Sequence, residues 1–195
     1  MKHRSSILFV LGFTTALALG WTAFPKALYR TQSQPVQFSH KIHGGEKVGL
    51  ACDDCHTVTE AGYFTGIPKL EKCSGCHAEP VSQSADEKLF VERYVKAEKE
   101  VPWLVYSRQP QNVRFSHAIH SSRAKLACAD CHGQHGKSDK LRPYQENRIS
   151  GYSRDIWGPS ISRISAVERP GMKMDDCTHC HAGRGVLTAC QACHK

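Results

Sequence analysis

The most apolar part of the chain lies near its N-terminus. Residues 7–24 read ILFVLGFTTALALGWTAF, without a charged residue, and Lys2 and Arg4 precede them. As a helix this run would be about 27 Å long, just enough to cross a bilayer. It is either a signal peptide, with a cleavage-like Ala-Leu-Ala at 16–18, or an uncleaved anchor. We favour the anchor, and under either interpretation the rest of the chain leaves the cytoplasm because positive charge stays inside.

A second helical pattern follows much later. Ser84 and Glu87 have the spacing of a capping box, and Pro102 closes the segment. The apolar face is formed by Leu89, Phe90, Tyr94 and Val95. We predict a helix that packs on cofactor edges, with partner docking as the alternative.

The remaining segments show little regular periodicity. Residues 25–37 hold two prolines and many polar residues, which is typical of a tether. Residues 133–172 form a long insertion rich in Arg, Ser, Gly and Tyr. This insertion is either a functional loop with a partner surface or a solvated loop. We expect little β-sheet.

All ten cysteines belong to five copies of one motif, Cys-x-x-Cys-His. This motif attaches haem c: two thiols bond the porphyrin vinyl groups, and the histidine becomes the proximal iron ligand. The attachment cysteines are Cys52, Cys55, Cys73, Cys76, Cys128, Cys131, Cys177, Cys180, Cys190 and Cys193. The proximal ligands are His56, His77, His132, His181 and His194.

Other uses of cysteine explain this pattern less well. Zinc ribbons need Cys-x-x-Cys pairs in twos, and five do not pair evenly. A disulfide scaffold leaves the histidine after each pair unexplained. A thioredoxin-like motif occurs once or twice in a βαβ setting that we do not expect here. We therefore predict five covalent haems c.

An internal repeat supplies further histidines. The segment 38–56 reads FSHKIHGGEKVGLACDDCH, and 115–132 reads FSHAIHSSRAKLACADCH. Each copy begins with two histidines three residues apart, which are neighbours on a helical turn. One iron needs only one distal ligand, so each pair is expected to serve two different haems.

Five histidines remain as distal ligands once the proximal ones are removed. His3 precedes the apolar run, and His179 lies inside a motif, where ligation of its own haem is disfavoured. The candidates are His40, His43, His117, His120 and His135. Met172 and Met174 stand just before the fourth motif, and a thioether ligand would raise the potential of its haem. Met174 and His135 compete for the fifth place.

Composition agrees with a cofactor-rich protein. Hydrophobic residues make up 40% of the 195 residues and aromatic residues only 8%. This apolar content is low for a conventional hydrophobic core. Since only roughly 34 exported residues serve each haem, we predict a mainly α chain with much loop that surrounds a stack of haems. The net charge of +8 is largely a counter-charge to haem propionates, and no nucleic-acid motif is present.

The paired histidines and the Cys-x-x-Cys-His motifs resemble the class III cytochromes c, the c3 and c7 group. That resemblance implies that His40 faces the haem of His56 and His117 that of His132, while His120 reaches the last haem. The chain departs from the family by lacking a histidine just before its fourth motif. The units implied are an anchor 1–26, a dihaem unit 27–80, a linker helix 81–114 and a trihaem unit 115–195.

The anchored two-plus-three arrangement is also similar to multihaem subunits of menaquinone reductase (Qrc) complexes and to the pentahaem subunit of alternative complex III. Residues 106–117, YSRQPQNVRFSH, favour the Qrc type. Iron–sulfur or molybdopterin-type subunits, an integral quinone-binding subunit and a soluble periplasmic cytochrome c3 are the partners implied. An extra haem would have to be non-covalent, with His135 or His179 as ligand, because no cysteine remains.

These resemblances imply an electron-transfer subunit that does not itself bind quinone. It would be anchored in the inner membrane by a single helix, with its haem domain in the periplasm. A reductase of nitrite or sulfite is the alternative from another class, and it needs an iron with an open position. A soluble periplasmic shuttle, released by signal cleavage, is a third.

Overall fold

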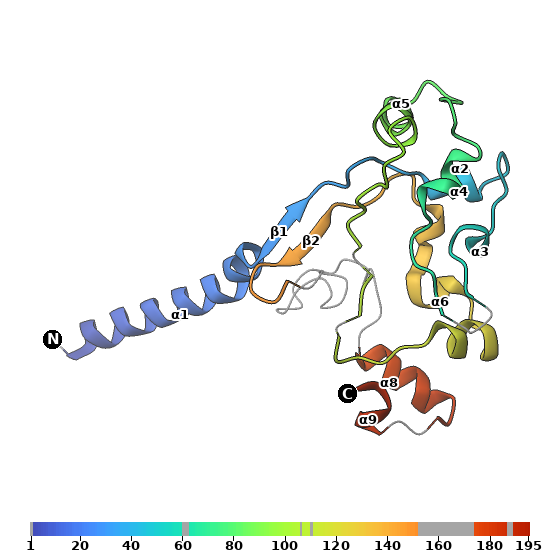
Figure 1. Cartoon of the computed structure of the whole chain (residues 1–195). Helices are drawn as coiled ribbons and strands as arrows, with labels where there is room; N and C mark the ends of the chain where they lie inside the picture. Colours follow the sequence, from blue (N-terminus) through green and yellow to red (C-terminus); the bar gives the residue numbers. More distant parts are fainter. Residues whose placement is uncertain (1, 60–62, 106, 110, 152–173, 187–188) are drawn as a thin grey trace.

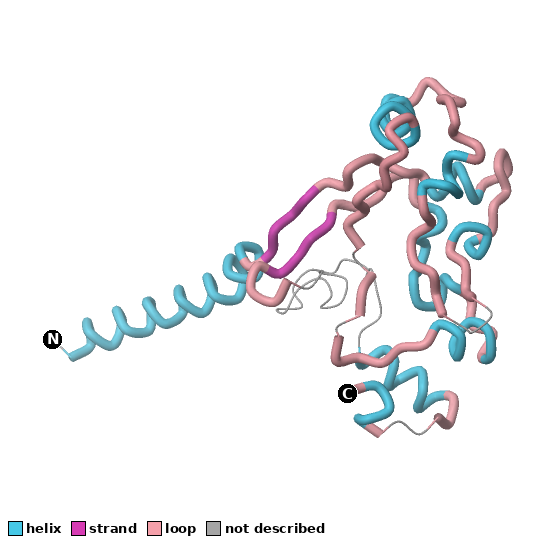
Figure 2. Tube along the Cα trace, viewed as in Figure 1, coloured by secondary structure: helices cyan, strands magenta, loops and turns pink. Residues whose placement is uncertain are grey.

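The computed structural model describes residues 2–59, 63–105, 107–109, 111–151, 174–186 and 189–195. These residues form one long helix, a two-stranded sheet, and a body of short helices joined by loops (Figures 1 and 2). The predicted class, a mainly helical chain with much loop and little sheet, is confirmed for this part of the chain.

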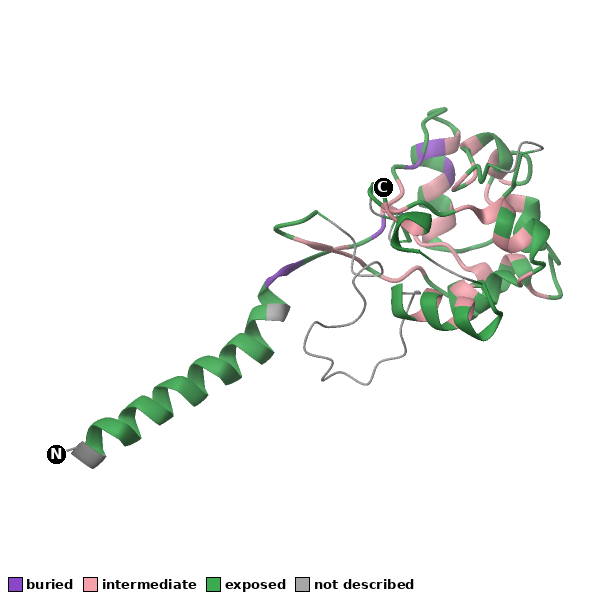
Figure 3. Ribbon diagram, turned by 90° about the horizontal axis from the view of Figure 1, so that it is seen from below, coloured by how far each residue is buried: buried purple, intermediate pink, exposed green. Residues whose placement is uncertain are grey.

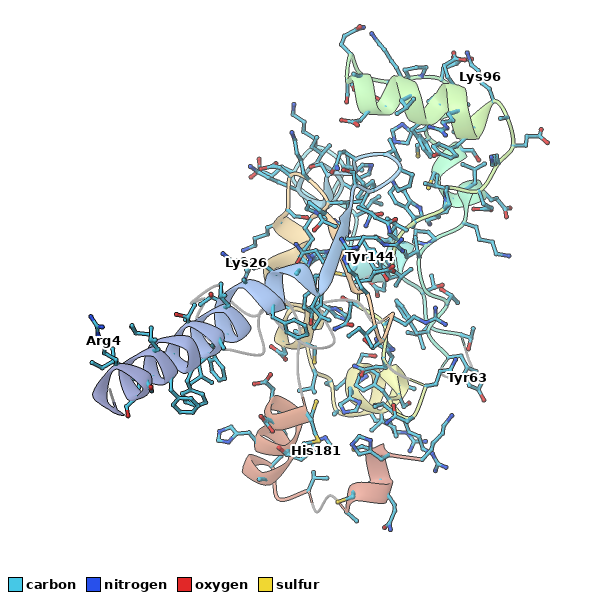
Figure 4. The ribbon with its side chains drawn as sticks, turned by 90° about the vertical axis from the view of Figure 1, so that its left-hand side faces the viewer. Arg4, Lys26, Tyr63, Lys96, Tyr144 and His181 are labelled. Atoms are coloured by element: carbon cyan, nitrogen blue, oxygen red, sulfur yellow. The ribbon has the colours of Figure 1, made fainter. Side chains whose placement is uncertain are left out.

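Helix α1, Lys2–Ala27, extends away from the body (Figure 1). Figure 4 shows Arg4 and Lys26 at its opposite ends. Its segment Arg4–Phe24 has a mean hydropathy of 1.9 and none of it is buried against the rest of the chain. A helix of this length and composition can cross a membrane, and its apolar surface would be covered by lipid.

The segment after α1 differs from the expected tether. Residues Tyr29–Gln32 form strand β1, which pairs antiparallel with β2, Tyr144–Asn147. Arg30 forms an ion pair with Glu146 across the two strands, and Tyr29 is buried. The first part of the long insertion therefore supplies a partner strand, which local sequence could not reveal because the two segments are far apart in the chain.

A small apolar cluster packs the linker helix onto the first unit. Helix α5, Ala85–Phe90, starts after Ser84 as predicted and continues as a π-helical turn, η1, Val91–Val95. The cluster consists of Val36, Tyr94 and Val101, with Leu70, Phe90 and Trp103 packed against it. Most of the remaining chain is exposed or half-buried (Figure 3), which agrees with the thin core expected from composition.

The two halves of the body are held together by hydrogen bonds. Helix α2, His40–Gly44, lies against the 3-10 turn η3, Gly133–Lys137, and Lys41 N–H donates to the Ser138 carbonyl at 3.1 Å. Leu141 N–H donates to the Gln37 side-chain oxygen at 3.0 Å, so the predicted units 27–80 and 115–195 are in direct contact. A further bond fixes the C-terminus to the end of the linker, where Arg114 N–H donates to the Cys193 carbonyl at 2.7 Å.

Tyr94→Ala is expected to lower the free energy of unfolding by about 3–5 kcal/mol, because Tyr94 is 2% exposed and a cavity would replace its ring. Guanidinium unfolding of the detergent-solubilised protein, followed by circular dichroism, measures this change. The matched control is Tyr63→Ala: Tyr63 is 74% exposed, so we expect a change within about 0.5 kcal/mol. Equal changes in the free energy of unfolding for the two substitutions would show that the cluster around Tyr94 does not stabilise the fold.

Candidate haem sites

The five motifs lie on short helices, and we number them as sites 1 to 5 in chain order. Site 1 is on α3, Cys52–Cys55, site 2 on α4, Leu70–Ser74, and site 3 on α6, Cys128–His132. Site 4 lies within α8, Met174–Gly183, and site 5 on α9, Cys190–Cys193. On a helix, residues three apart share a face, so both thiols of a motif can reach one porphyrin edge.

The second variable residue of sites 1 and 3 fixes the helical turn. The Asp54 carboxylate accepts from Ala51 N–H at 2.7 Å, and Asp130 accepts from Ala127 N–H at 3.0 Å. All ten cysteines lie at exposed or half-buried positions, and none is bonded to another cysteine. The donor set therefore fits thioether attachment, because each pair is accessible. In four sites both cysteines lie on one helix, and in site 2 Cys76 follows the end of α4.

The second histidine of each repeat is oriented by its own helix. His43 Nδ1 lies 2.8 Å from the Ser39 carbonyl, and His120 Nδ1 lies 2.8 Å from the Ser116 carbonyl. His43 is on α2, and His120 is on the π-helical turn η2, Ala118–Arg123. Since a carbonyl can only accept, Nδ1 donates, and Nε2 remains free to bind a metal.

Three histidine pairs face each other at the distance that axial iron ligation requires. The ring centres are 6.0 Å apart for His43 and His77, 6.4 Å for His117 and His132, and 6.0 Å for His120 and His181. Two imidazoles with metal–nitrogen bonds of about 2 Å on opposite sides of one ion have ring centres roughly 6 Å apart. Figure 4 shows His181 on α8. Sites 2, 3 and 4 thus each have a facing imidazole.

One of these pairs differs from the expectation drawn from the c7 resemblance. That resemblance placed His120 at the last haem, whereas its ring centre lies 6.0 Å from that of His181 of site 4, with an interplanar angle of 11°. His117 caps η2 and His120 lies on it, so one short segment carries the rings that face His132 and His181. The other expectation, His117 facing His132, agrees with the observed spacing.

His40 and His135 lie together beside site 1. Their ring centres are 5.2 Å apart, and the Ser138 hydroxyl lies 3.3 Å from His40 Nδ1. Burial, and then the nearby His56 and His43, lower the pKa of His40. Burial, followed by His40 and Arg142, lowers the pKa of His135 to about 4. Both side chains are therefore neutral at pH 7, the form that binds metals, and both lie beside site 1.

The remaining sequence candidates are less well placed. Met174 begins α8 and is 61% exposed, and Met172 lies outside the described residues. His179 is exposed. Among the residues that the structure describes, no second histidine ring stacks on His194 of site 5. The assignment of the fifth distal ligand to Met174 or His135 therefore stays a prediction.

Glu87 contacts a proximal histidine, which the sequence had not indicated. Its carboxylate lies 2.8 Å from His77 Nδ1 and also accepts from the Val81 and Ser82 backbone N–H groups. Burial alone would raise the pKa of Glu87, but these hydrogen bonds outweigh it and lower the pKa. The expected capping bond at Ser84 is not formed, because Glu87 turns back to His77. Its spacing of ten residues from His77 is the only sequence signal.

Glu87→Gln is expected to raise the potential of the site 2 haem, because a carboxylate on Nδ1 makes the imidazole a stronger donor to ferric iron. If the substitution shifts the ferric/ferrous equilibrium of this haem tenfold, its potential rises by about 59 mV, because one electron is transferred. Potentiometric titration should show one haem in five moving upward. The control is Glu92→Gln, because Glu92 bonds Lys96 at 2.8 Å on the exposed side of η1. An unchanged titration curve for Glu87→Gln would refute the role.

Aromatic rings at the start of each repeat also belong to the sites. Phe38 contacts both His40 and His43, with ring centres 4.9 and 4.3 Å apart. Phe115 contacts His117 and His120 at 4.8 and 4.7 Å. The same three rings therefore recur in both units, and the phenylalanine opening each repeat in the sequence is the signal that could have identified them.

Comparison with known families agrees with this geometry. Residues 21–103 match the model of the class III cytochrome c family, and residues 113–195 match cytochrome c7 and related cytochromes c. Both matches include the Cys-x-x-Cys-His motifs of their units. Together they define a multihaem c-type cytochrome with covalently bound haem c.

A relative in Nitratidesulfovibrio vulgaris (strain Hildenborough) narrows the class. The chain is 39% identical to its menaquinone reductase, multihaem cytochrome c subunit, over 96% of this chain and 89% of the relative. The chain therefore belongs to the family of this multihaem cytochrome c subunit. Its role in electron transfer follows from that membership, and the apolar α1 agrees with association with a membrane.

Proposed function

We propose that the chain carries five haems c and passes electrons between a soluble periplasmic cytochrome of the c3 type and a membrane menaquinone oxidoreductase complex. The observation that carries this proposal is the set of three facing histidine pairs, His43–His77, His117–His132 and His120–His181. An iron held on both faces by imidazole has no free position for a substrate, so it can only exchange electrons.

The proposed ligand sets follow the motifs. The two cysteines of each motif bond the porphyrin, and the histidine after them is the proximal ligand. His40 serves site 1 because it lies beside His56, with His135 next to it. Met174 is the candidate for site 5, because α8 directly precedes α9 in the second unit. The polypeptide orients these ligands through the carbonyl and carboxylate bonds to Nδ1, and the haem supplies the redox change.

The proposed location is the inner membrane, with α1 as a single-pass anchor and the haem body in the periplasm. The positive residues Lys2 and Arg4 lie before the apolar segment, which favours an N-terminus inside. The partners are the other subunits of the complex, an iron–sulfur or molybdopterin-type subunit and an integral quinone-binding subunit. The relative's description as a menaquinone reductase subunit supports this set.

Electron exchange and carbon monoxide binding, measured on the membrane complex, test the proposal. A menaquinone analogue should oxidise the prereduced haems, and a soluble c3-type cytochrome should reduce them. Carbon monoxide added to the reduced complex should leave the haem spectrum of this subunit unchanged. Uptake of carbon monoxide by one haem in five of the wild-type chain, with reduction of nitrite or sulfite, would favour the reductase and refute the electron carrier.

N-terminal sequencing of the mature chain tests the proposed anchor. A sequence that begins before residue 7 would show an uncleaved anchor, and one that begins after the apolar segment would show a cleaved signal peptide.

A further inference from the structure

We propose that the haem sites form one unbranched line in the order 2, 1, 3, 4, 5, so that electrons pass from one end of the line to the other and neither end is site 1. This order rests on the proposed function, because it presumes a haem at each motif. It differs from the order of the motifs in the sequence. In Figure 1 the motif helices α4, α3, α6, α8 and α9 follow one another from the top to the bottom of the view.

The contact between sites 2 and 1 is made by helix α2. His43 faces His77 of site 2, while His40 lies beside His56 of site 1, and Phe38 touches both rings of the pair. One helical turn therefore holds ligands of both haems.

The contact between sites 1 and 3 joins the two units. The Phe64 ring lies between His56 of site 1, at 6.0 Å, and His117 of site 3, at 4.4 Å, and it is nearly parallel to both. Site 1 is thus a neighbour of both site 2 and site 3, although site 2 is closer to it in sequence.

The contact between sites 3 and 4 repeats the arrangement of the first. His117 faces His132 of site 3, and His120, one turn later on η2, faces His181 of site 4, with Phe115 against both distal rings. In each unit the FSHxxH segment therefore supplies distal ligands to two neighbouring haems.

Site 5 extends the line beyond site 4. Helix α9 of site 5 follows α8 of site 4 after a short connection and lies next to it in Figure 1. The C-terminal segment is fixed by the Val113–His194 bridge and by Lys195 N–H, which donates to the Asn112 carbonyl at 3.0 Å. These bonds place site 5 next to the segment that leads into Phe115. Site 5 is therefore the end of the line beyond site 4.

Anomalous scattering at the iron absorption edge, from crystals of the detergent-solubilised full-length holoprotein, tests the order. Five iron peaks in one line, assigned to motifs through their thioether cysteines as 2, 1, 3, 4, 5, are expected. Five peaks in another order, or in a closed ring with sites 2 and 5 adjacent, would overturn the line and leave the five-haem proposal intact. Fewer than five peaks would instead overturn the haem count on which the proposed function depends.

Discussion

The His43→Ala variant is expected to bind carbon monoxide at one haem in five, whereas the wild-type chain binds none. His43 faces His77 at 6.0 Å, and without its imidazole the iron of site 2 keeps only the proximal ligand. The ferric spectrum should gain a high-spin component equal to one-fifth of the total. The midpoint potential of that haem should also rise, because loss of an imidazole donor disfavours the ferric state. Electron paramagnetic resonance and a carbon monoxide difference spectrum measure these changes.

His179→Ala is the matched control for this variant. His179 is exposed on α8 and lies inside the site 4 motif, so its removal should leave all five haems low-spin. A His43→Ala protein that stays entirely low-spin would show that another group ligates site 2. Carbon monoxide binding by the His179→Ala variant would show that the exposed histidine is a ligand, and would contradict the pairing of His120 with His181.

Removing the central haem should divide the line of sites into two isolated pairs. In the Cys128→Ala, Cys131→Ala variant the haem content falls from five to four. Sites 1 and 2 remain neighbours, and so do sites 4 and 5, but the contact across Phe64 now leads to no haem. A reduced soluble cytochrome that docks at one end should reduce two of the four haems rapidly and the other two slowly. Stopped-flow absorbance at the haem bands measures the two amplitudes.

The control for this experiment removes a haem from the end of the line. The Cys190→Ala, Cys193→Ala variant also retains four haems, yet its sites 2, 1, 3 and 4 remain contiguous. Its haems should be reduced in a single phase, whatever the overall rate. A single phase in both variants would mean that electrons bypass site 3. A haem count below four in the central variant would point to loss of neighbouring haems, and the count is therefore checked by pyridine haemochrome first.

Features that depend on neighbouring residues could be predicted from the sequence. Haem attachment depends on residues within one motif, so Cys52, Cys55 and His56, and the equivalent residues of the other sites, are predicted without a structure, and membership of the class III cytochrome c family supports covalent haem c. The histidine pairs are equally local, because residues three apart share a helical face. The helix after Ser84 and the apolar N-terminal helix were predicted for the same reason, and both are confirmed.

Contacts between distant segments could not be predicted in the same way. His120 faces His181 across two segments that are far apart in the chain, and no periodicity in either segment encodes that choice. Strand β1 was taken for a tether because its partner stands in an insertion more than a hundred residues later. Glu87 was read as a capping residue, since Ser84 and Glu87 fit that pattern locally, whereas a proximal histidine offers the carboxylate a stronger partner.

The most direct test of the whole account is the intact mass of the mature chain, produced together with a cytochrome c maturation system. The account predicts the mass of the polypeptide plus five haems, all retained after denaturation because thioether bonds hold them. A mature chain that carries no haem mass, or that loses every haem on unfolding, would contradict covalent attachment at these cysteines and with it the assignment of every iron ligand.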